Sequence, residues 1–231
     1  MSALVREEIR ARIGSSSAAD RLVVTPLLDP ERQLGPGSID LRLGTEFLEV
    51  PRQNQSHMDP FRASAADAVL HAEDRRFFVP LGDPFVLHPG QFVLGATLEF
   101  LVMPNDLIGQ VLSRSSWGRL GLLVATAVAV QPGFRGVLTL ELVNAGAVPI
   151  TLRPGLRVAQ LQLWRSDEPV SDGYVSGGKY DAPLGPQSNR LAWEDGERAI
   201  LSKISDSMLA RAGNASDDMD GQASEQMDQP E

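Results

Sequence analysis

The chain has 231 residues, of which 42% are hydrophobic, and its formal net charge is −9. This length and apolar content allow one large domain with a sizeable core, whereas the negative charge argues against binding long nucleic acid through a general basic surface. The sequence has no cysteine, and its histidines, His57, His71 and His88, are widely spaced, which argues against a disulfide framework and the usual zinc sites. We find no apolar run long enough to cross a membrane and no signal-like N-terminus, so we expect a cytoplasmic protein.

The first predicted elements are a helix and a short strand. Residues 3–13 place Leu4 and Ile9 near one side of a helix, with charged residues elsewhere. Gly14 follows and ends the helical pattern. Residues 21–28 then indicate a strand that is interrupted by a proline.

The next predicted strand carries two opposite charges. Residues 35–44, GPGSIDLRLG, predict a tight turn followed by an alternating strand. Asp40 and Arg42 are two positions apart and therefore share one face of that strand. We interpret them as a charge pair that helps a sheet or a trimer to pack, and contact with a ligand is the alternative.

Short strands dominate the remaining pattern. Residues 52–77 are polar and irregular, so we predict a long excursion outside the core. Residues 78–101 indicate short strands separated by a Pro-Gly turn, and residues 149–164 indicate another hairpin of the same kind. The 21 glycines and 16 prolines lie mostly between apolar runs, which favours a mainly β protein built as a jelly-roll-like double sheet.

Most of the chemically useful polar side chains lie between residues 112 and 141. Arg114, Ser115, Ser116 and Arg119 fall within six residues of one another. Two guanidinium groups beside two hydroxyl groups are suited to bind several phosphate oxygens at once. We therefore predict an anion-binding clamp formed by these four residues.

A single carboxylate follows on an apolar strand. Residues 137–143, VLTLELV, alternate strictly, so Glu141 faces the side opposite to Leu138, Leu140 and Leu142. A buried glutamate near an arginine is in general more often part of an ion pair than a catalyst. Its role therefore depends on the motifs around it.

The C-terminal part divides into three predicted segments. Residues 171–190 are turn-rich, and their glycines give the backbone the freedom expected of a mobile lid. Residues 191–212 have apolar side chains at helical spacing and predict a helical extension. Residues 213–231 are acidic with almost no apolar residues, so we expect disorder.

Several strings resemble one family in the family's own order. They are GSIDLRLG (37–44), LHPGQFVLGATLE (87–99), SRSSWGRLGL (113–122), TAVAVQPGFRG (126–136) and LTLELVNAGAVPITLRPGLRVAQL (138–161). Together they resemble the dCTP deaminases of the dUTPase-like superfamily, over about residues 1–190. The resemblance implies one domain, 1–190, with a dUTPase-like jelly-roll-type β-barrel or double sheet, a short N-terminal helix and assembly as a homotrimer.

The resemblance also implies a reaction and the residues that perform it. The reaction is zinc-independent hydrolytic deamination of dCTP to dUTP and ammonia, with Mg²⁺ accompanying the triphosphate and sites between adjacent subunits. Glu141 would be the general base and acid, with Ser115 and Arg119 placing the water. The remaining implied contacts are to phosphate, base and sugar, from Arg114, Ser115, Ser116, Arg119, Ala127, Gln131, Lys179 and Tyr180.

Three departures from the family pattern concern substrate recognition. Gln131 stands where the family has an aspartate, and a neutral amide can hydrogen-bond a sugar hydroxyl but carries no charge. The chain is one residue shorter between Arg119 and Thr126, and the glutamine often found after the Lys-Tyr pair is replaced near Pro183. Two alternatives remain open: a dUTP pyrophosphatase-like or bifunctional enzyme, and a nucleotide-binding trimer without turnover.

Overall fold

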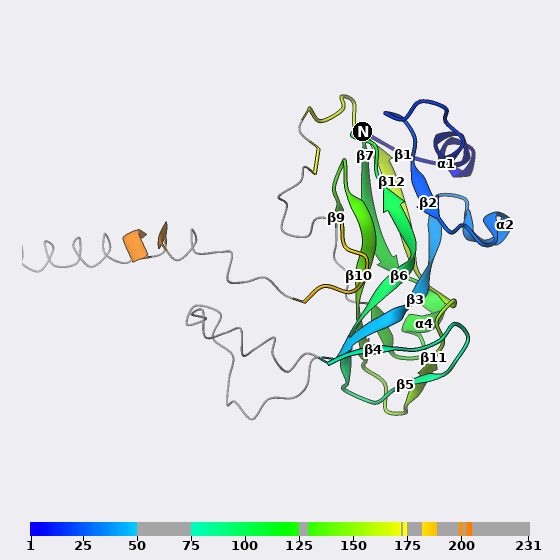
Figure 1. Cartoon of the computed structure of the whole chain (residues 1–231), viewed down its shortest axis with the longest axis vertical. Coiled ribbons are helices and arrows are strands. Elements are labelled where there is room, and N and C mark those ends of the chain that lie inside the picture. Colours follow the sequence, from blue (N-terminus) through cyan, green and yellow to red (C-terminus); the bar gives the residue numbers. More distant parts are fainter. Residues whose placement is uncertain are drawn as a thin grey trace, which may run out of the picture. The chain divides into compact units, whose positions relative to one another are not determined.

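The structure is a computed structural model that describes residues 1–49, 75–124, 129–171, 173–174, 182–188, 199–200 and 202–204. The chain divides into two compact units, one made of residues 1–54 and 69–189 and the other of residues 55–68 and 190–231. The fold described below is that of the first unit (Figure 1).

This unit is built almost entirely from antiparallel strands. The strands are β1 (Ser2–Ala3), β2 (Val23–Thr25), β3 (Ile39–Glu49), β4 (Arg75–Phe78), β5 (Phe85–Leu87), β6 (Phe92–Val102), β7 (Leu107–Ser113), β8 (Leu122–Val124), β9 (Ala129–Val130), β10 (Arg135–Asn144), β11 (Ile150–Leu152) and β12 (Arg157–Arg165). The helices are α1 (Arg6–Ile13), α2 (Pro30–Gln33) and α4 (Ser115–Gly118). The predicted mainly β fold with a short N-terminal helix is confirmed.

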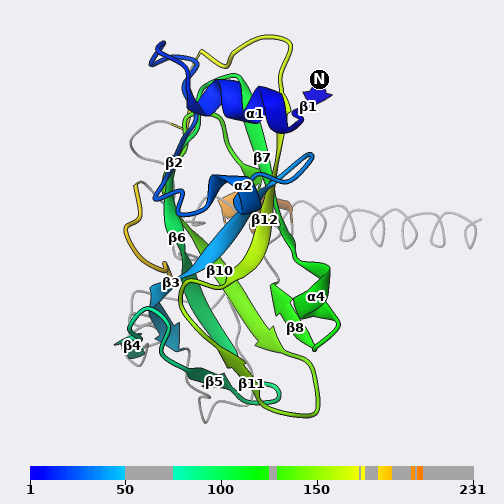
Figure 2. The same ribbon diagram turned by 90° about the vertical axis from the view of Figure 1, so that its right-hand side faces the viewer.

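Among the described residues, ten strands form one sheet whose main order is β8-β10-β6-β3-β12-β7-β9, while β5 and β11 pair separately. The sheet turns back on itself at β3 (Figure 2). Residues 39–42 of β3 pair with β12, whereas residues 43–49 pair with β6 and β4. β3 therefore belongs to both halves of a double sheet.

A glycine permits this change of partner. Gly44 lies within the register shift between Leu43 and Phe47, where β3 pairs with β6. A Cβ atom added to Gly44 would lie 2.9 Å from the carbonyl oxygen of Ala96 and 3.1 Å from that of Thr97. Any larger residue at position 44 would push the two strands apart.

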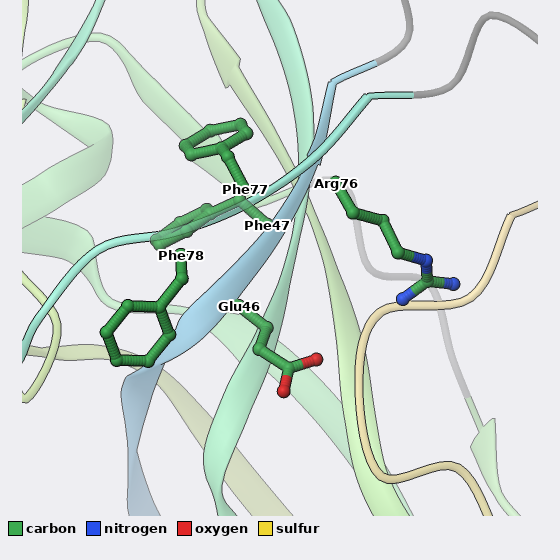
Figure 3. Close-up of a pocket in the computed structure, with 5 residues that line it drawn as sticks. All are labelled: Glu46, Phe47, Arg76, Phe77 and Phe78. Carbon is green, nitrogen blue, oxygen red and sulfur yellow. The ribbon is translucent and has the colours of Figure 1, made fainter.

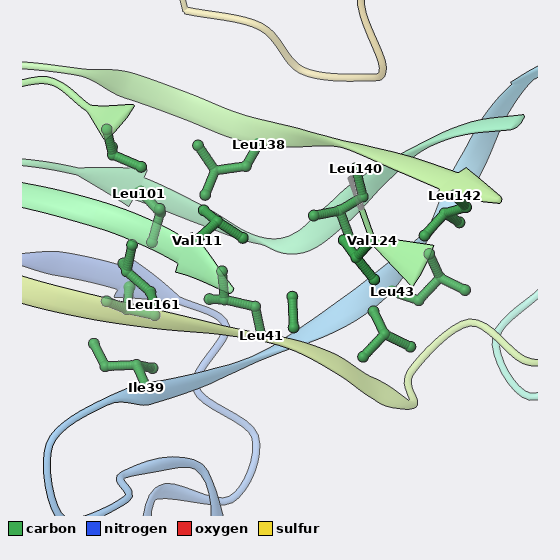
Figure 4. Close-up of a cluster of buried hydrophobic side chains, with 14 of the residues drawn as sticks. Ile39, Leu41, Leu43, Leu101, Val111, Val124, Leu138, Leu140, Leu142 and Leu161 are labelled. Atoms are coloured by element: carbon green, nitrogen blue, oxygen red, sulfur yellow. The ribbon is translucent and has the colours of Figure 1, made fainter. Parts of the chain in front are cut away.

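The core lies between the two halves of the double sheet (Figure 4). Leu138, Leu140 and Leu142 of β10 point into this space at successive places along it, with Leu138 near Val111 of β7 and Leu142 near Leu43 of β3, and all five are buried. Burial of each such leucine stabilises the fold by about 1.5–3 kcal/mol. The alternation predicted for residues 137–143 is the pattern of a strand with one face in this core.

Local predictions near the N-terminus hold with small changes. α1 ends at Gly14 as predicted, but it begins only at Arg6, because Ser2 and Ala3 pair with β12. The carboxylate of Glu8 accepts a hydrogen bond from the backbone N–H of Val5 at 3.1 Å, which satisfies one donor at the start of the helix. β2 stops immediately before Pro26, as the sequence indicates.

Other predicted segments fall largely outside the described residues. Of the polar excursion over residues 52–77, only residues 75–77 are described, and they belong to β4, which the sequence analysis did not predict. Of the extension over residues 191–212, residues 199–200 and 202–204 are described and are helical. The acidic tail lies outside the described residues. In the described part of the chain, no helix is long and apolar enough to span a membrane.

A buried glutamate on β6 was not anticipated. Glu99 is fully buried, and its Oε1 accepts from Nε2 of Gln33 at 2.9 Å while its Oε2 accepts from the backbone N–H of Arg42 at 2.8 Å. Burial disfavours the ionised form more than these hydrogen bonds favour it. The pKa of Glu99 is consequently raised to about 7.

We expect Glu99 to make folding stability depend on pH. An unfolded carboxyl ionises near pH 4.5, whereas folded Glu99 keeps its proton until about pH 7. The folded state binds more protons across this window, so Glu99's contribution to stability falls by up to about 3 kcal/mol as the pH rises through it. In Glu99→Gln this fall should be absent, as measured by chemical denaturation from pH 4.5 to 7.5.

A surface carboxylate provides the control for this measurement. Glu31 pairs with Arg10 and its side chain is 81% exposed, so Glu31→Gln leaves Glu99 and its partners in place and should still show the fall in stability. An unchanged slope in Glu99→Gln would mean that Glu99 ionises normally in the folded state.

Candidate functional site

The structure gathers the four predicted clamp residues on one turn. β7 ends at Ser113, and α4, a single helical turn, occupies Ser115–Gly118. Ser115, Ser116 and Arg119 are exposed, and Arg114 is half-buried. The clamp is therefore a surface feature of the connection between β7 and β8.

Two side chains anchor this turn to β12. The carbonyl oxygen of Arg157 accepts a hydrogen bond from Nε1 of Trp117 at 2.8 Å and another from Nη1 of Arg114 at 3.2 Å. Trp117 also packs against the buried core. Neither Trp117 nor Arg157 was singled out from the sequence, although an aromatic residue between the clamp residues was a visible signal for an anchor.

Asp40 lies beneath the clamp and pairs with arginines from two other elements. Its Oδ2 accepts from Nη1 of Arg157 at 2.9 Å and lies 3.5 Å from Nη2 of Arg114. Its Oδ1 accepts from Nε2 of Gln160 at 3.0 Å. The side chain of Asp40 is only 8% exposed, so this carboxylate is held almost out of solvent by charged and amide partners.

The interpretation of Asp40 and Arg42 as a charge pair is wrong. Arg42 instead donates from Nε to Gln33 at 3.2 Å and from Nη1 to the carbonyl oxygen of Gly155 at 2.7 Å. The reason is that β3 passes from one half of the double sheet to the other immediately after Arg42. Two side chains on one face of a strand then meet different neighbours.

Glu141 lies on the face of β10 that points away from the core. It is half-buried, as are Thr139 and Val143 on the same face. The residue opposite Glu141 on β6 is Leu94, which is buried, and the residue opposite Thr139 is Ala96. The predicted carboxylate therefore stands among apolar neighbours, with part of its surface accessible.

The described part of the C-terminal segment lies along this same strand. The backbone N–H of Val137 donates to the carbonyl oxygen of Pro183 at 2.8 Å, and the backbone N–H of Gln187 donates to Oγ1 of Thr139 at 3.0 Å. Thr139 is two positions from Glu141 and shares its face. Residues 182–188 thus pass close to the carboxylate, as a covering segment would.

The same segment adjoins a small pocket formed by β3 and β4 (Figure 3). The pocket has a volume of about 240 Å³ and is lined by Glu46, Phe47, Arg76, Phe77 and Phe78. Phe47 and Phe77 stack with ring centroids 5.3 Å apart. The pocket contains none of the predicted site residues.

Gln131 lies in the turn between β9 and β10. The backbone N–H of Phe134 donates to the carbonyl oxygen of Gln131 at 3.1 Å, and the side chain of Gln131 is exposed. Tyr174 packs edge-on against Phe134 and donates its backbone N–H to the carbonyl oxygen of Pro132 at 2.6 Å. The turn is thus held by the start of the predicted lid segment. Ala127, Lys179 and Tyr180 lie outside the described residues.

A single chain brings the predicted site together only in part. Among the described residues, no recorded hydrogen bond or ion pair joins Arg114, Ser115, Ser116 or Arg119 to Glu141. The clamp is on the β7–β8 connection and the carboxylate is on the outward face of β10. Within one chain, the clamp and Glu141 therefore lie on different elements.

We expect Gly136 to control the docking of residues 182–188. Gly136 has φ +138°, and a Cβ atom there would lie 2.5 Å from Cδ of Pro183. In Gly136→Ala the unfavourable backbone alone costs about 1–3 kcal/mol, and the clash with Pro183 adds to it. Hydrogen exchange should show loss of protection at the N–H groups of Val137 and Gln187.

Gly82 offers the matched control for this variant. It has φ +85°, but an added Cβ would meet nothing within 4 Å. Gly82→Ala therefore introduces backbone strain without a clash and should leave protection at Val137 and Gln187 unchanged. Equal protection in Gly136→Ala and the original protein would show that residues 182–188 do not depend on this contact.

Comparisons with known proteins show the family of the chain. A family model described as dCTP deaminase-like matches residues 3–166. A dCTP deaminase, dUMP-forming, from Dictyoglomus thermophilum is 41% identical over 174 residues, which cover 74% of this chain and 87% of the relative. A dCTP deaminase from Natronomonas pharaonis is 43% identical over 187 residues, covering 80% of this chain and 92% of the relative.

A solved structure gives the same result. The crystal structure of 2'-deoxycytidine 5'-triphosphate deaminase from Agrobacterium tumefaciens superposes with a TM-score of 0.52 and 27% sequence identity, covering 71% of this chain. The chain spans about half, 48%, of the length of that protein. The resemblance found in the sequence is thereby confirmed, and the chain belongs to the dCTP deaminase-like family.

Proposed function

We propose that this protein hydrolyses the exocyclic amino group of dCTP, giving dUTP and ammonia. The observation that carries the proposal is Glu141, a half-buried carboxylate among apolar neighbours on the outward face of β10. Relatives named dCTP deaminase at 41–44% identity support it. The proposal assigns the proton transfers of the reaction to this carboxylate.

The chemistry needs a nucleophilic water and a carrier for two protons. Glu141 takes a proton from water as the oxygen bonds to C4 of the cytosine ring, and it delivers that proton to N3. It then passes the second proton of the water to the exocyclic nitrogen, so that ammonia leaves and C4 becomes a carbonyl. A positioned group of this kind accelerates a reaction about 10²–10⁴-fold. Ser115 and Arg119 place the water.

The clamp residues bind the triphosphate. Arg114, Ser115 and Ser116 present a guanidinium and two hydroxyl groups on one exposed turn, which matches the donors that phosphate oxygens require. Lys179 and Tyr180 close over the phosphates, Gln131 contacts the sugar, and the backbone at Ala127 lies beside the base.

The complete site forms between subunits of a homotrimer. The support is that the clamp and Glu141 are not joined by any recorded interaction in the described part of a single chain. A second chain would bring a clamp to the Glu141 of its neighbour. Cross-linking or ultracentrifugation of the full chain tests the trimer independently of activity.

Magnesium enters with the nucleotide. Within the described ranges, no three His, Asp or Glu side chains are grouped to hold a metal ion. Phosphate oxygens are ligands that Mg²⁺ accepts readily, so the ion screens the triphosphate while the clamp binds its remaining oxygens. Zinc has no part in the proposed reaction, and activity should survive a zinc-selective chelator when Mg²⁺ is present.

A second candidate product is dUMP. The relatives from Dictyoglomus thermophilum and Nocardia farcinica, 41% and 43% identical, are named dUMP-forming. Such an enzyme would use a second water to release pyrophosphate from the triphosphate after deamination. The family's aspartate is Gln131 in this chain, which favours dUTP as the product here.

One assay separates these functions. The protein is incubated with dCTP and Mg²⁺, and ammonia, dUTP, dUMP and pyrophosphate are resolved over time. Ammonia with dUTP is the expected result, and ammonia with equal amounts of dUMP and pyrophosphate would identify the dUMP-forming reaction. Binding of dCTP without release of ammonia would contradict the proposal.

A further inference from the structure

We propose that Asp40 is a positioning residue for the phosphate clamp, acting through Arg114. The inference rests on the proposed function of the clamp, and it assigns to Asp40 a role in selecting the triphosphate. Asp40 is on β3, while Arg114 precedes α4 and Arg157 begins β12. One carboxylate therefore connects three elements at the base of the clamp.

The contacts orient the guanidinium of Arg114 rather than merely neutralising it. Nη1 of Arg114 donates to the carbonyl oxygen of Arg157 at 3.2 Å, and Nη2 lies 3.5 Å from Oδ2 of Asp40. Two of its three nitrogens are thus directed inward. The side chain remains 26% exposed, so the part of the guanidinium group that faces solvent is held in one orientation. A guanidinium held in this way loses less freedom when it binds phosphate.

Asp40 is itself held in place. Its Oδ1 accepts from Gln160 at 3.0 Å and its Oδ2 from Arg157 at 2.9 Å. With a side chain only 8% exposed, it has little room to change rotamer. Asp40, Arg114 and Arg157 together carry a net charge of +1. Asp40 can therefore orient Arg114 without cancelling the positive charge at the base of the clamp.

Charge and orientation predict opposite results when the carboxylate is removed. If charge alone mattered, Asp40→Asn would raise the net charge of the group to +2 and strengthen dCTP binding. If orientation matters, the two guanidinium groups that share Oδ2 would repel each other, and the partly exposed Arg114 would move into solvent. We expect orientation to dominate, since misplacing a contact group by about 1 Å can cost up to about 10²-fold.

The test uses calorimetric binding of dCTP and of deoxycytidine to the full chain, together with kcat and KM. Asp40→Asn should weaken dCTP binding about tenfold and leave deoxycytidine binding unchanged. In the Arg114→Ala background, Asp40→Asn should cause no further loss of dCTP affinity, because its effect passes through that arginine. If the proposed deamination is wrong, the original protein will show no kcat for ammonia release. The role of Asp40 is decided separately, by the dissociation constants of the variants, which do not depend on turnover.

Matched variants separate positioning from general stability. Asp106 forms a comparable partly buried ion pair with Arg12, with side chains 18% and 17% exposed, and Asp106→Asn should lower thermal stability without changing the ratio of the two affinities. If Asp40→Asn does not fold, Gln160→Leu removes one support of Asp40 and leaves all charges in place. It should weaken dCTP binding about threefold, again without affecting deoxycytidine.

Three results would overturn the proposal. They are unchanged or tighter dCTP binding in Asp40→Asn, equal weakening of dCTP and deoxycytidine, and a full additional loss of dCTP affinity when Asp40→Asn is added to Arg114→Ala. If Asp40→Asn does not fold, unchanged dCTP binding in Gln160→Leu overturns it equally.

Discussion

Replacing Glu141 by glutamine is expected to lower the rate of deamination by at least about 10²-fold while dCTP still binds. Glutamine keeps the shape of the side chain but can neither take a proton from water nor return one to the base. Because Glu141 is half-buried on the outward face of β10 and outside the hydrophobic core, the fold should persist. The measurements are kcat by ammonia release and the Kd for dCTP.

Glu49→Gln is the control for this variant. Glu49 is a half-buried glutamate at the end of β3 that accepts a hydrogen bond from Gln91 at 3.1 Å, so the substitution removes a similar charge from a strand that β6 separates from β10. It should leave kcat unchanged. Near-normal turnover in Glu141→Gln would contradict the role of Glu141, and loss of dCTP binding there would indicate a binding role instead.

Replacing Arg114 by alanine is expected to weaken dCTP binding by about 1.5–3 kcal/mol, which is the cost of losing a charge-assisted contact. Deoxycytidine has no phosphate, so its binding should be unchanged. The substitution also removes the hydrogen bond to the carbonyl oxygen of Arg157 and the pairing with Asp40. Thermal unfolding should therefore be measured alongside the two Kd values.

An arginine outside the clamp supplies the comparison. Arg153 lies in the turn between β11 and β12 and donates to the carbonyl oxygen of Gly82 at 2.7 Å, so Arg153→Ala removes an equal charge and a similar backbone contact. It should leave dCTP binding nearly unchanged. Equal weakening of dCTP and deoxycytidine in Arg114→Ala would count against a phosphate-binding role.

Features set by neighbouring residues could be predicted from the sequence. The strand that carries Glu141 was predicted because alternation over a few positions decides which side chains face the core. The end of α1 at Gly14 and the stop of β2 before Pro26 follow from local backbone chemistry. The clamp residues are within one turn of each other simply because they are close in the chain.

Features that depend on strand pairing could not be predicted in this way. Asp40 and Arg157 are 117 positions apart, and they meet because β3 pairs with β12 before it crosses to β6. The same crossing separates Arg42 from Asp40. Spacing along one strand could not identify the neighbours of either side chain.

The sequence by itself thus determined the mainly β class, the family and the outward direction of Glu141, because these depend on local pattern and on strings of adjacent residues. Only the tertiary structure decided that Asp40 pairs with Arg114, that Trp117 anchors α4 to β12 and that Glu99 is buried with a raised pKa. The physical reason is that burial and ion pairing depend on which strands become neighbours, and that is set by the packing of the whole double sheet rather than by any one segment.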